Sequence, residues 1–278
     1  MRAGFSHFVL QHLLHYKTSP YYRGKKITNS RPRGPHTWGS LRQDTISYAG
    51  FTPRPTGAHL AWAFAMFAAG MLGAAGCGFA AGFLAKSTGG PVGDLITLGA
   101  FLGFVLAGGG VLYFGLVRRY GWGWQEFGFT RPTRSLWHLT WWIPATIAAG
   151  GIGAMLIGTA LGLSPSGGSS ETAGFHLSIV ASILIFVITV ILAPLFEEIV
   201  FRRVLMDWLD ARFSTWIAAT VTTVAFTAAH ISPAIMLYIV FLGTSLILAR
   251  LWFGSLWGSF LVHAANNGLV TAIALLAL

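Results

Sequence analysis

Residues 191–203 read ILAPLFEEIVFRR, and this stretch decides how the rest of the chain must fold. It places Glu197, Glu198 and Arg202 at the end of an apolar run that begins near Leu177. Ionisable side chains in such a run are costly unless they are paired or hydrated, so they are functional candidates by default. Glu198 and Arg202 lie one helical turn apart and can pair on one face. Glu197 lies about 100° around the helix from Glu198 and must face another partner.

The composition is that of a membrane protein. The chain has 278 residues, of which 54% are hydrophobic and only 9% are charged, and its mean hydropathy is +0.66. Soluble domains carry about 25% charged residues. The apolar runs are long and continuous, whereas a transmembrane barrel shows short alternating segments. We therefore predict an all-α fold, a polytopic transmembrane helical bundle in a lipid bilayer.

The apolar runs predict about seven spans, one of which need not cross the bilayer fully. We place them at 58–85, 95–117, 136–163, 177–208, 214–231, 233–250 and 255–278.

The charges of the loops predict the orientation. The formal net charge is +10, and with the N-terminus in the cytoplasm 17 of the 18 Lys and Arg residues fall on the inside. The positive-inside rule then favours an integral protein of the inner (cytoplasmic) membrane with a cytoplasmic N-terminus. Residues 1–57 hold nine basic residues against one acid, which favours contact with anionic lipid. The same distribution argues against nucleic-acid binding.

The chain divides into three parts on composition. Residues 1–57 are a basic and partly disordered cytoplasmic segment, because Pro, Gly, Ser and Asn run through them. Residues 58–123 are scaffold transmembrane helices, because dense Gly and Ala allow close helix packing. Residues 124–278 are the catalytic transmembrane core. The single cysteine, Cys77, excludes an internal disulfide.

Spacing brings two helices to a common depth. Glu197 lies 15 residues before Arg212 at the predicted turn, and His230 lies 18 residues after it. In an antiparallel hairpin these two positions are within about 5 Å along the axis. We expect the helix to break at His230-Ile231-Ser232-Pro233, and a break inside the membrane requires protein or a wet cavity around it. We expect a polar pocket that opens to the cytoplasm.

Three pairs of residues, each four apart, carry the chemistry. They are Glu198 with Arg202, Phe226 with His230, and His263 with Asn267. A glutamate and a histidine can share the proton of a water and act as general base and then acid. A second histidine and an asparagine can donate hydrogen bonds to a tetrahedral oxyanion. The set suits attack of water on a carbonyl.

Each pair also has a structural interpretation. Glu198 and Arg202 can form an ion pair at a helix end, and His230 can cap a helix. Asn267 can satisfy His263 without catalysis. Asp207 and Asp210 resemble a solvated face.

At these residues the sequence resembles a known family. EEIVFR, FTAAH and HAANN fit, in order, the EExxxR, FxxxH and HxxxN motifs of the CAAX prenyl endopeptidase type II and bacteriocin-processing family (CPBP or Abi proteins). With the lead-in WQEFGF, the resemblance covers roughly residues 124–278. It implies an intramembrane glutamic endopeptidase, without a cofactor, whose active site opens toward the cytoplasm.

The resemblance also implies roles for individual residues. Glu197 and His230 would activate water, and His263 and Asn267 would form the oxyanion hole. Glu198 and Arg202 would orient the site, with Phe226 as a further supporting residue. Arg203 departs from the pattern, since many bacterial members have Gly there, and it would add bulk beside the site.

Other interpretations stay open. Zinc could bind at Glu197, His230 and His263, although the sequence has no HExxH motif. A non-catalytic membrane protein that binds a peptide or gives immunity to a bacteriocin would use the same cavity. A proton-coupled transporter would show internal repeats, and none is seen. The composition looks bacterial, and a peptide or the tail of a membrane protein is the expected substrate.

Overall fold

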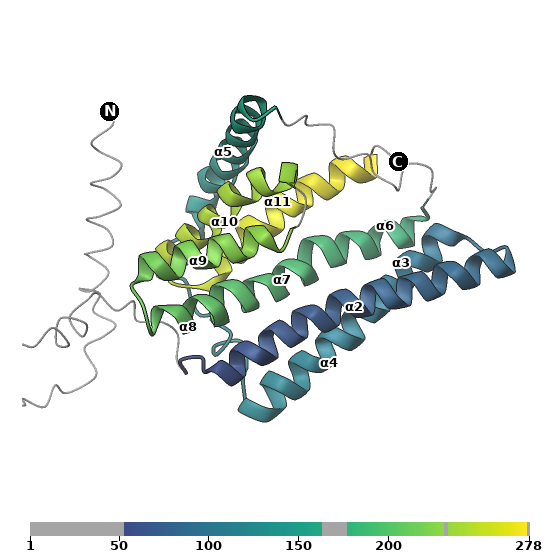
Figure 1. Ribbon diagram of the computed structural model, residues 1–278, viewed down its shortest axis with the longest axis horizontal. Coiled ribbons are helices and arrows are strands. Elements are labelled where there is room, and N and C mark those ends of the chain that lie inside the picture. Colours follow the sequence, from purple (N-terminus) through teal and green to yellow (C-terminus); the bar gives the residue numbers. More distant parts are fainter. Residues whose placement is uncertain (1–52, 163–176, 231–232, 277–278) are drawn as a thin grey trace, which may run out of the picture. The chain divides into compact units, whose positions relative to one another are not determined.

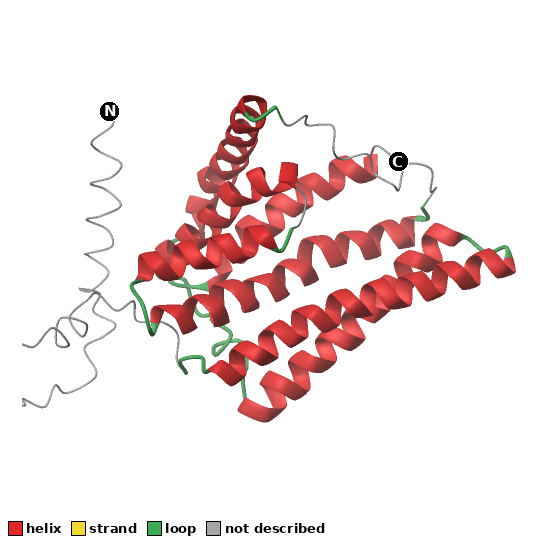
Figure 2. Cartoon of the chain, viewed as in Figure 1, coloured by secondary structure: helices red, strands yellow, loops and turns green. Residues whose placement is uncertain are grey.

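A computed structural model describes residues 53–162, 177–230 and 233–276. Every regular element in these ranges is helical, as Figure 2 shows, so the predicted all-α fold is confirmed. The predictions for residues 1–52 lie outside the described residues. The described ranges fall within one compact unit, Thr45–Leu278.

In the described ranges seven rods follow one another, and two of them are divided by π-helical segments. The first rod is α2 (Gly57–Thr88). The second runs through α3 (Val92–Gly103), η4 (Phe104–Gly108), α4 (Gly109–Leu112) and η5 (Tyr113–Arg118). The third consists of η6 (Leu136–His138) and α5 (Leu139–Ala160). The fourth rod runs through α6 (Ile179–Phe186), η7 (Val187–Leu192), α7 (Ala193–Glu197), η8 (Glu198–Leu205) and α8 (Met206–Asp210). The last three rods are single helices: α9 (Thr215–Ala228), α10 (Pro233–Phe253) and α11 (Leu256–Leu276).

Six of these rods are long and apolar enough to cross a membrane. The seventh, α9, has 14 residues. At 1.5 Å per residue it reaches only about 21 Å, less than the roughly 30 Å of a hydrocarbon core. The prediction of about seven helices, with one that does not cross fully, therefore agrees with the structure. Large apolar side chains such as Phe79 and Ile179 are nearly four-fifths exposed, as residues facing lipid would be.

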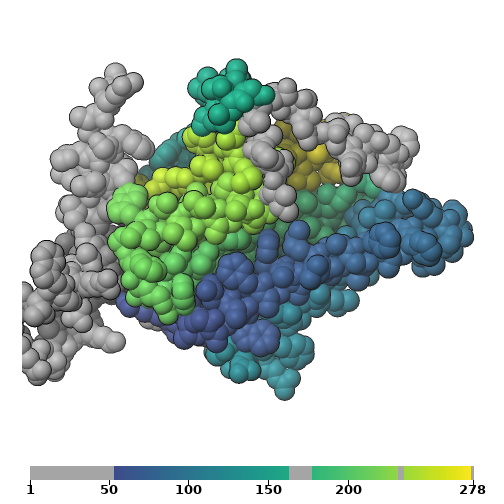
Figure 3. Space-filling view, in the orientation of Figure 1, coloured from purple at the N-terminus to yellow at the C-terminus, as the bar shows by residue number. Residues whose placement is uncertain are grey.

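The rod of α6 to α8 lies between two groups of helices. Figure 1 shows α2, α3 and α4 on one side of it and α9, α10 and α11 on the other. On the face shown in Figure 3, side chains of α2 and α9 form the surface. The acidic residues of this central rod are therefore placed where several helices can supply partners for them.

The central rod is not a regular α-helix, because it contains two π-helical segments, η7 and η8. Pro194 stands at the start of α7, directly after η7. Proline has no N–H and crowds the preceding turn, so a wide turn before it relieves the conflict. The second wide turn begins at Glu198, and π-helical turns inside α-helices occur often at functional sites.

The α2 and α3 helices touch backbone to backbone at glycines. A Cβ on Gly103 would lie 2.0 Å from the carbonyl oxygen of Gly73. A Cβ on Gly73 would lie 2.3 Å from the carbonyl oxygen of Gly103. The dense glycines of this region therefore do what the sequence predicts, since they let two helices approach closely.

Gly103→Ala should destabilise the protein, because the new methyl group has no space between α2 and α3. Overpacking of this kind costs about 1–3 kcal/mol. Thermal unfolding of purified protein in detergent, followed by tryptophan fluorescence, would show a lower midpoint. Gly109→Ala is the matched control, because a Cβ there meets nothing within 4 Å. Equal midpoints for the two variants would contradict the proposed contact.

Candidate functional site

Glu198 is the most tightly enclosed acid of the central rod. Its side chain is fully buried, and its Oε1 lies 3.1 Å from Nη1 of Arg202. The same oxygen lies 3.0 Å from Nδ1 of His263 in α11. The predicted pair of Glu198 and Arg202 is thus formed. Because a lone buried carboxylate is costly, these two partners make the position of Glu198 tolerable.

His263 joins both glutamates. Its Nδ1 faces Glu198, and a carboxylate can only accept, so this nitrogen carries a hydrogen. Its Nε2 lies 3.5 Å from Oε2 of Glu197. The Glu197 side chain is 15% exposed while that of His263 is 2% exposed. Glu197 is therefore the acid of this group that remains within reach of solvent.

Phe226 of α9 covers the buried guanidinium. The Cζ atom of Arg202 lies 3.9 Å from the centre of the Phe226 ring, which is a cation–π contact. The same ring meets the His230 ring at 4.9 Å and the His263 ring at 5.8 Å, both edge to face. Phe226 thus contacts three of the predicted site residues, which accounts for an aromatic residue at this position.

His230 lies at the end of α9 and bonds to its own helix. Its Nδ1 is 2.9 Å from the carbonyl oxygen of Phe226. A carbonyl can only accept, so Nδ1 carries a hydrogen and Nε2 of the neutral ring is an acceptor. Within the described ranges, His230 makes no hydrogen bond or ion pair with Glu197. The common depth predicted from the sequence thus brings His230 to the group through Phe226 and not by a direct contact.

Asn267 follows His263 by four residues on α11 and faces η7. Its Nδ2 donates to the carbonyl oxygen of Thr189 at 3.0 Å. Its Oδ1 accepts from Nδ2 of Asn266 at 3.2 Å. Asn266 also accepts a hydrogen bond from the hydroxyl of Tyr238 in α10. Sequence reasoning missed Asn266 and Tyr238, although the second asparagine in HAANN and a tyrosine inside an apolar span were the available signals.

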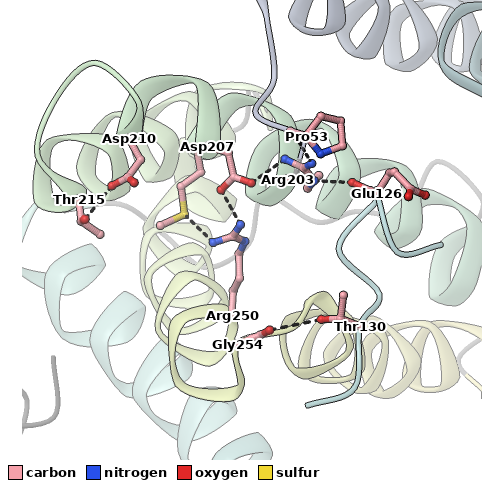
Figure 4. A network of polar contacts seen from close by, with 10 residues as sticks. Pro53, Glu126, Thr130, Arg203, Asp207, Asp210, Thr215, Arg250 and Gly254 are labelled. Atoms are coloured by element: carbon pink, nitrogen blue, oxygen red, sulfur yellow. Dashed lines mark hydrogen bonds and ion pairs between the residues drawn. The ribbon is translucent and has the colours of Figure 1, made fainter. Parts of the chain in front are cut away.

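The prediction that Asp207 and Asp210 form a solvated face is wrong for Asp207. Its side chain is only 2% exposed, and it lies between two arginines, as Figure 4 shows. Its Oδ2 is 2.7 Å from Nη1 of Arg203, and its Oδ1 is 2.5 Å from Nη2 of Arg250. Asp210 is half-buried and accepts a hydrogen bond from Thr215. Helical periodicity placed these acids outside, but arginines from two helices cover Asp207.

Arg203 belongs to this second cluster and not to the group around Glu197. Besides Asp207, it donates to the backbone carbonyls of Glu126 and Pro53 at 2.6 and 2.7 Å. Its guanidinium also lies over the ring of Trp122. The expectation that Arg203 adds bulk beside the site is therefore wrong, because its side chain fastens the central rod to segments that precede it in the chain.

A metal ion needs several His, Cys, Asp or Glu side chains at one place. No three His, Cys, Asp or Glu side chains within the described ranges are grouped as the ligands of one metal ion would be. Zinc at Glu197, His230 and His263 therefore gains no support from this geometry.

Fold and site together define a class. The protein is a polytopic helical membrane protein in which two glutamates, an arginine and histidines from three helices gather at one place. Residues 179–269 match the family described as type II CAAX prenyl endopeptidase Rce1-like. The matched segment holds every predicted site residue from Glu197 to Asn267. The match confirms the resemblance carried by the three motifs.

This match supports a membrane protease of the CAAX type, at the level of the family alone. The match begins at residue 179, so residues 124–178 lie outside it. The curated proteins and the solved structures give no significant match.

Arg202→Met should strongly destabilise the protein, because it leaves the buried Glu198 carboxylate without its cation. Removing one partner of a buried pair costs about 3–5 kcal/mol. Denaturation of the purified protein in mixed micelles would measure the loss.

Arg212→Met is the matched control for this variant, since Arg212 is an exposed residue of the turn that follows α8. A double variant, Glu198→Gln with Arg202→Met, should recover part of the lost stability. If Arg202→Met is no more damaging than Arg212→Met, the buried pair does not hold the site.

Proposed function

We propose that the protein is an intramembrane endopeptidase in which Glu197 and His230 activate a water molecule. In this proposal His263 and Asn267 stabilise the oxyanion. The observation that carries it is the placement of His263 between two carboxylates, one neutralised by Arg202 and the other partly exposed. The family match supplies the class of reaction, and the contacts of each residue support its role.

Glu197 suits the role of base better than Glu198. The charge of Glu198 is already balanced by Arg202, which lies 3.1 Å away. Within the described ranges, Oε2 of Glu197 has no hydrogen-bond donor at bonding distance. The Glu197 side chain as a whole is 15% exposed, so a water can reach its carboxylate and give it a proton.

His230 suits the role of second acceptor for the same proton. Its Nδ1–H is held by the carbonyl of Phe226, which leaves Nε2 as the nitrogen that accepts. The Phe226 ring packs against both His230 and His263. The Phe226 ring is thereby a common packing partner of the two imidazoles.

The oxyanion would be met by N–H groups from α11. Nδ1–H of His263 bonds to Glu198, so only a hydrogen on Nε2 could meet an anionic oxygen. Nε2 faces Oε2 of Glu197 at 3.5 Å, and its hydrogen would turn to the oxyanion once Glu197 has taken the proton of the water. Asn267 uses one Nδ2 hydrogen on Thr189 and has a second for the same purpose. Removing one such donor typically lowers kcat by about 10²–10³.

The reaction balances with water as the only co-reactant. The water oxygen bonds to the peptide carbonyl carbon, one of its protons passes to Glu197 and is shared with His230, and the other stays on the oxygen of the new carboxyl group. Collapse of the tetrahedral intermediate breaks the C–N bond, and the held proton passes to the leaving amine. No step needs an oxidant or a metal.

Glu197→Gln should abolish cleavage, because an amide cannot take the proton of the water. Purified protein in liposomes would be given a peptide with a C-terminal CaaX sequence, once farnesylated and once not, and products would be identified by mass spectrometry. Glu126→Gln makes the same chemical change outside the site and should leave cleavage unaltered. Unimpaired cleavage by Glu197→Gln would refute the glutamate mechanism.

Two further arms of this experiment address the alternatives. A protein that only binds peptides would cleave neither probe and would bind them equally well with Glu197→Gln. Zinc chemistry would show as loss of cleavage with a chelator and its return with zinc. Preference for the farnesylated probe would assign prenylated tails as substrates.

We infer that the N-terminus and the loops rich in arginine lie in the cytoplasm of a bacterial inner membrane. Among the described residues, Arg118, Arg119, Arg131, Arg134 and Arg212 lie at that end of their rods, while Lys86 lies at the other. The basic residues of 1–57 would then contact anionic lipid.

This orientation predicts which positions react with a membrane-impermeant maleimide in intact cells. In a Cys77→Ser background, Ser87→Cys should be labelled at once, because Ser87 would face the outside. Arg212→Cys should be labelled only after the cells are permeabilised. The reverse pattern would invert the proposed topology.

A further inference from the structure

A chain of hydrogen bonds links α10, α11 and η7 beside the glutamates. The hydroxyl of Tyr238 donates to Oδ1 of Asn266. Nδ2 of Asn266 donates to Oδ1 of Asn267 at 3.2 Å, and Nδ2 of Asn267 donates to the carbonyl of Thr189 at 3.0 Å. The proposed function does not use Tyr238 or Asn266.

Which group donates in each of these hydrogen bonds follows from the final acceptor, the Thr189 carbonyl. The carbonyl oxygen of Thr189 can only accept, so Asn267 must turn its NH₂ group toward it. Its Oδ1 then faces Asn266, which must donate through its own NH₂ group. Oδ1 of Asn266 is left facing Tyr238, which must donate through its hydroxyl. One backbone carbonyl thus sets the orientation of two amides.

The Thr189 carbonyl is available because the helix is irregular at this point. In a regular α-helix Ala193 would donate to it, but the N–H of Ala193 donates to Ile188 instead. In the π-helical register the donor would be the next residue, Pro194, which has no N–H. Pro194 and the wide turn of η7 therefore leave an acceptor that Asn267 fills.

Packing holds the other members of the chain in place. The Tyr238 ring lies against Gly150 of α5, where a Cβ would come within 2.6 Å of Cε2. Asn266 is 4% exposed. Oγ1 of Thr189 lies 3.0 Å from Oγ1 of Thr271, which fastens α11 to η7 at a second point. The amides therefore have no room to exchange partners freely.

We infer that Tyr238 and Asn266 are positioning residues that keep an N–H of Asn267 turned toward the substrate oxyanion. The inference rests on the proposed function, in which Asn267 is an oxyanion donor. The Thr189 carbonyl holds only the Nδ2 side of the Asn267 amide, and without Asn266 on its Oδ1 side the amide plane could rotate and carry the second N–H away from the substrate. Preorganised donors of this kind act on the transition state, so their loss lowers kcat and leaves KM nearly unchanged.

The kinetic test uses Tyr238→Phe, which removes one hydroxyl and keeps the ring against Gly150. We expect kcat to fall about 10-fold, which corresponds to about 1.4 kcal/mol, with KM within a factor of two. Tyr113→Phe is the matched control, because Tyr113 is an exposed residue of η5. In an Asn267→Ala background, Tyr238→Phe should cause no further loss. An additional fall there, or an unchanged kcat in the single variant, would overturn the inference.

A second test does not depend on activity. The chain has three asparagines, Asn29, Asn266 and Asn267. Selective ¹⁵N labelling of asparagine therefore gives three side-chain NH₂ pairs, and loss of one pair in Asn267→Ala assigns it. Tyr238→Phe should shift the pairs of Asn266 and Asn267, and Tyr113→Phe should shift none. If Tyr238→Phe leaves the Asn267 pair in place, the chain of bonds does not exist.

The two tests separate this inference from the proposed function. If Glu197→Gln and Asn267→Ala abolish cleavage while Tyr238→Phe leaves kcat unchanged, the proposed function stands and the positioning role falls. If Asn267→Ala cleaves normally, the oxyanion assignment falls and takes the inference with it, even if the NMR shifts are seen. If Glu197→Gln alone cleaves normally, only the general base of the proposal is wrong.

Discussion

The structure depends on the burial of one carboxylate, that of Glu198. Its side chain is fully buried within a rod that is otherwise long and apolar. A lone carboxylate in such a place is strongly unfavourable, and this cost is removed only if cations and donors come to it. Arg202 reaches it from the next turn and His263 from α11. Phe226 of α9 then covers the arginine. The packing of the central rod against α9 and α11 thus follows from the need to neutralise and cover the Glu198 carboxylate.

Consecutive arginines extend this constraint to the other side of the rod. Arg202 contacts Glu198, whereas Arg203 contacts Asp207, which also binds Arg250 of α10. Both clusters are buried, so a rotation of the rod about its axis would break ion pairs in each. Two charge clusters on one rod therefore fix its rotation as well as its depth. Such control is valuable where Glu197 must face solvent while its neighbour stays dry.

Much of this arrangement could be predicted from the sequence. Hydropathy gave the spans, and the four-residue spacing of Glu198 and Arg202 gave their ion pair. Counting residues on each side of the turn near Arg212 brought His230 to the depth of the glutamates. Asp207 was misjudged because periodicity describes one helix alone and does not show which arginines from another helix will cover an acid. Tyr238 and Asn266 were missed for the same reason, since they bond to each other across 28 positions of the sequence.

The irregular turns of the central rod lie beyond the reach of pattern reasoning, yet they explain why the site can be built there. In hydrocarbon, a backbone carbonyl that has lost its helical donor must find another. Pro194 removes such a donor from the register of η7, and the amide of Asn267 supplies the replacement. The same proline comes shortly before Glu197 and Glu198. The irregular turn whose free carbonyl binds the Asn267 amide therefore lies directly before the two acids in the rod. A helix without this defect would carry the same carboxylates but would offer α11 no backbone acceptor beside them.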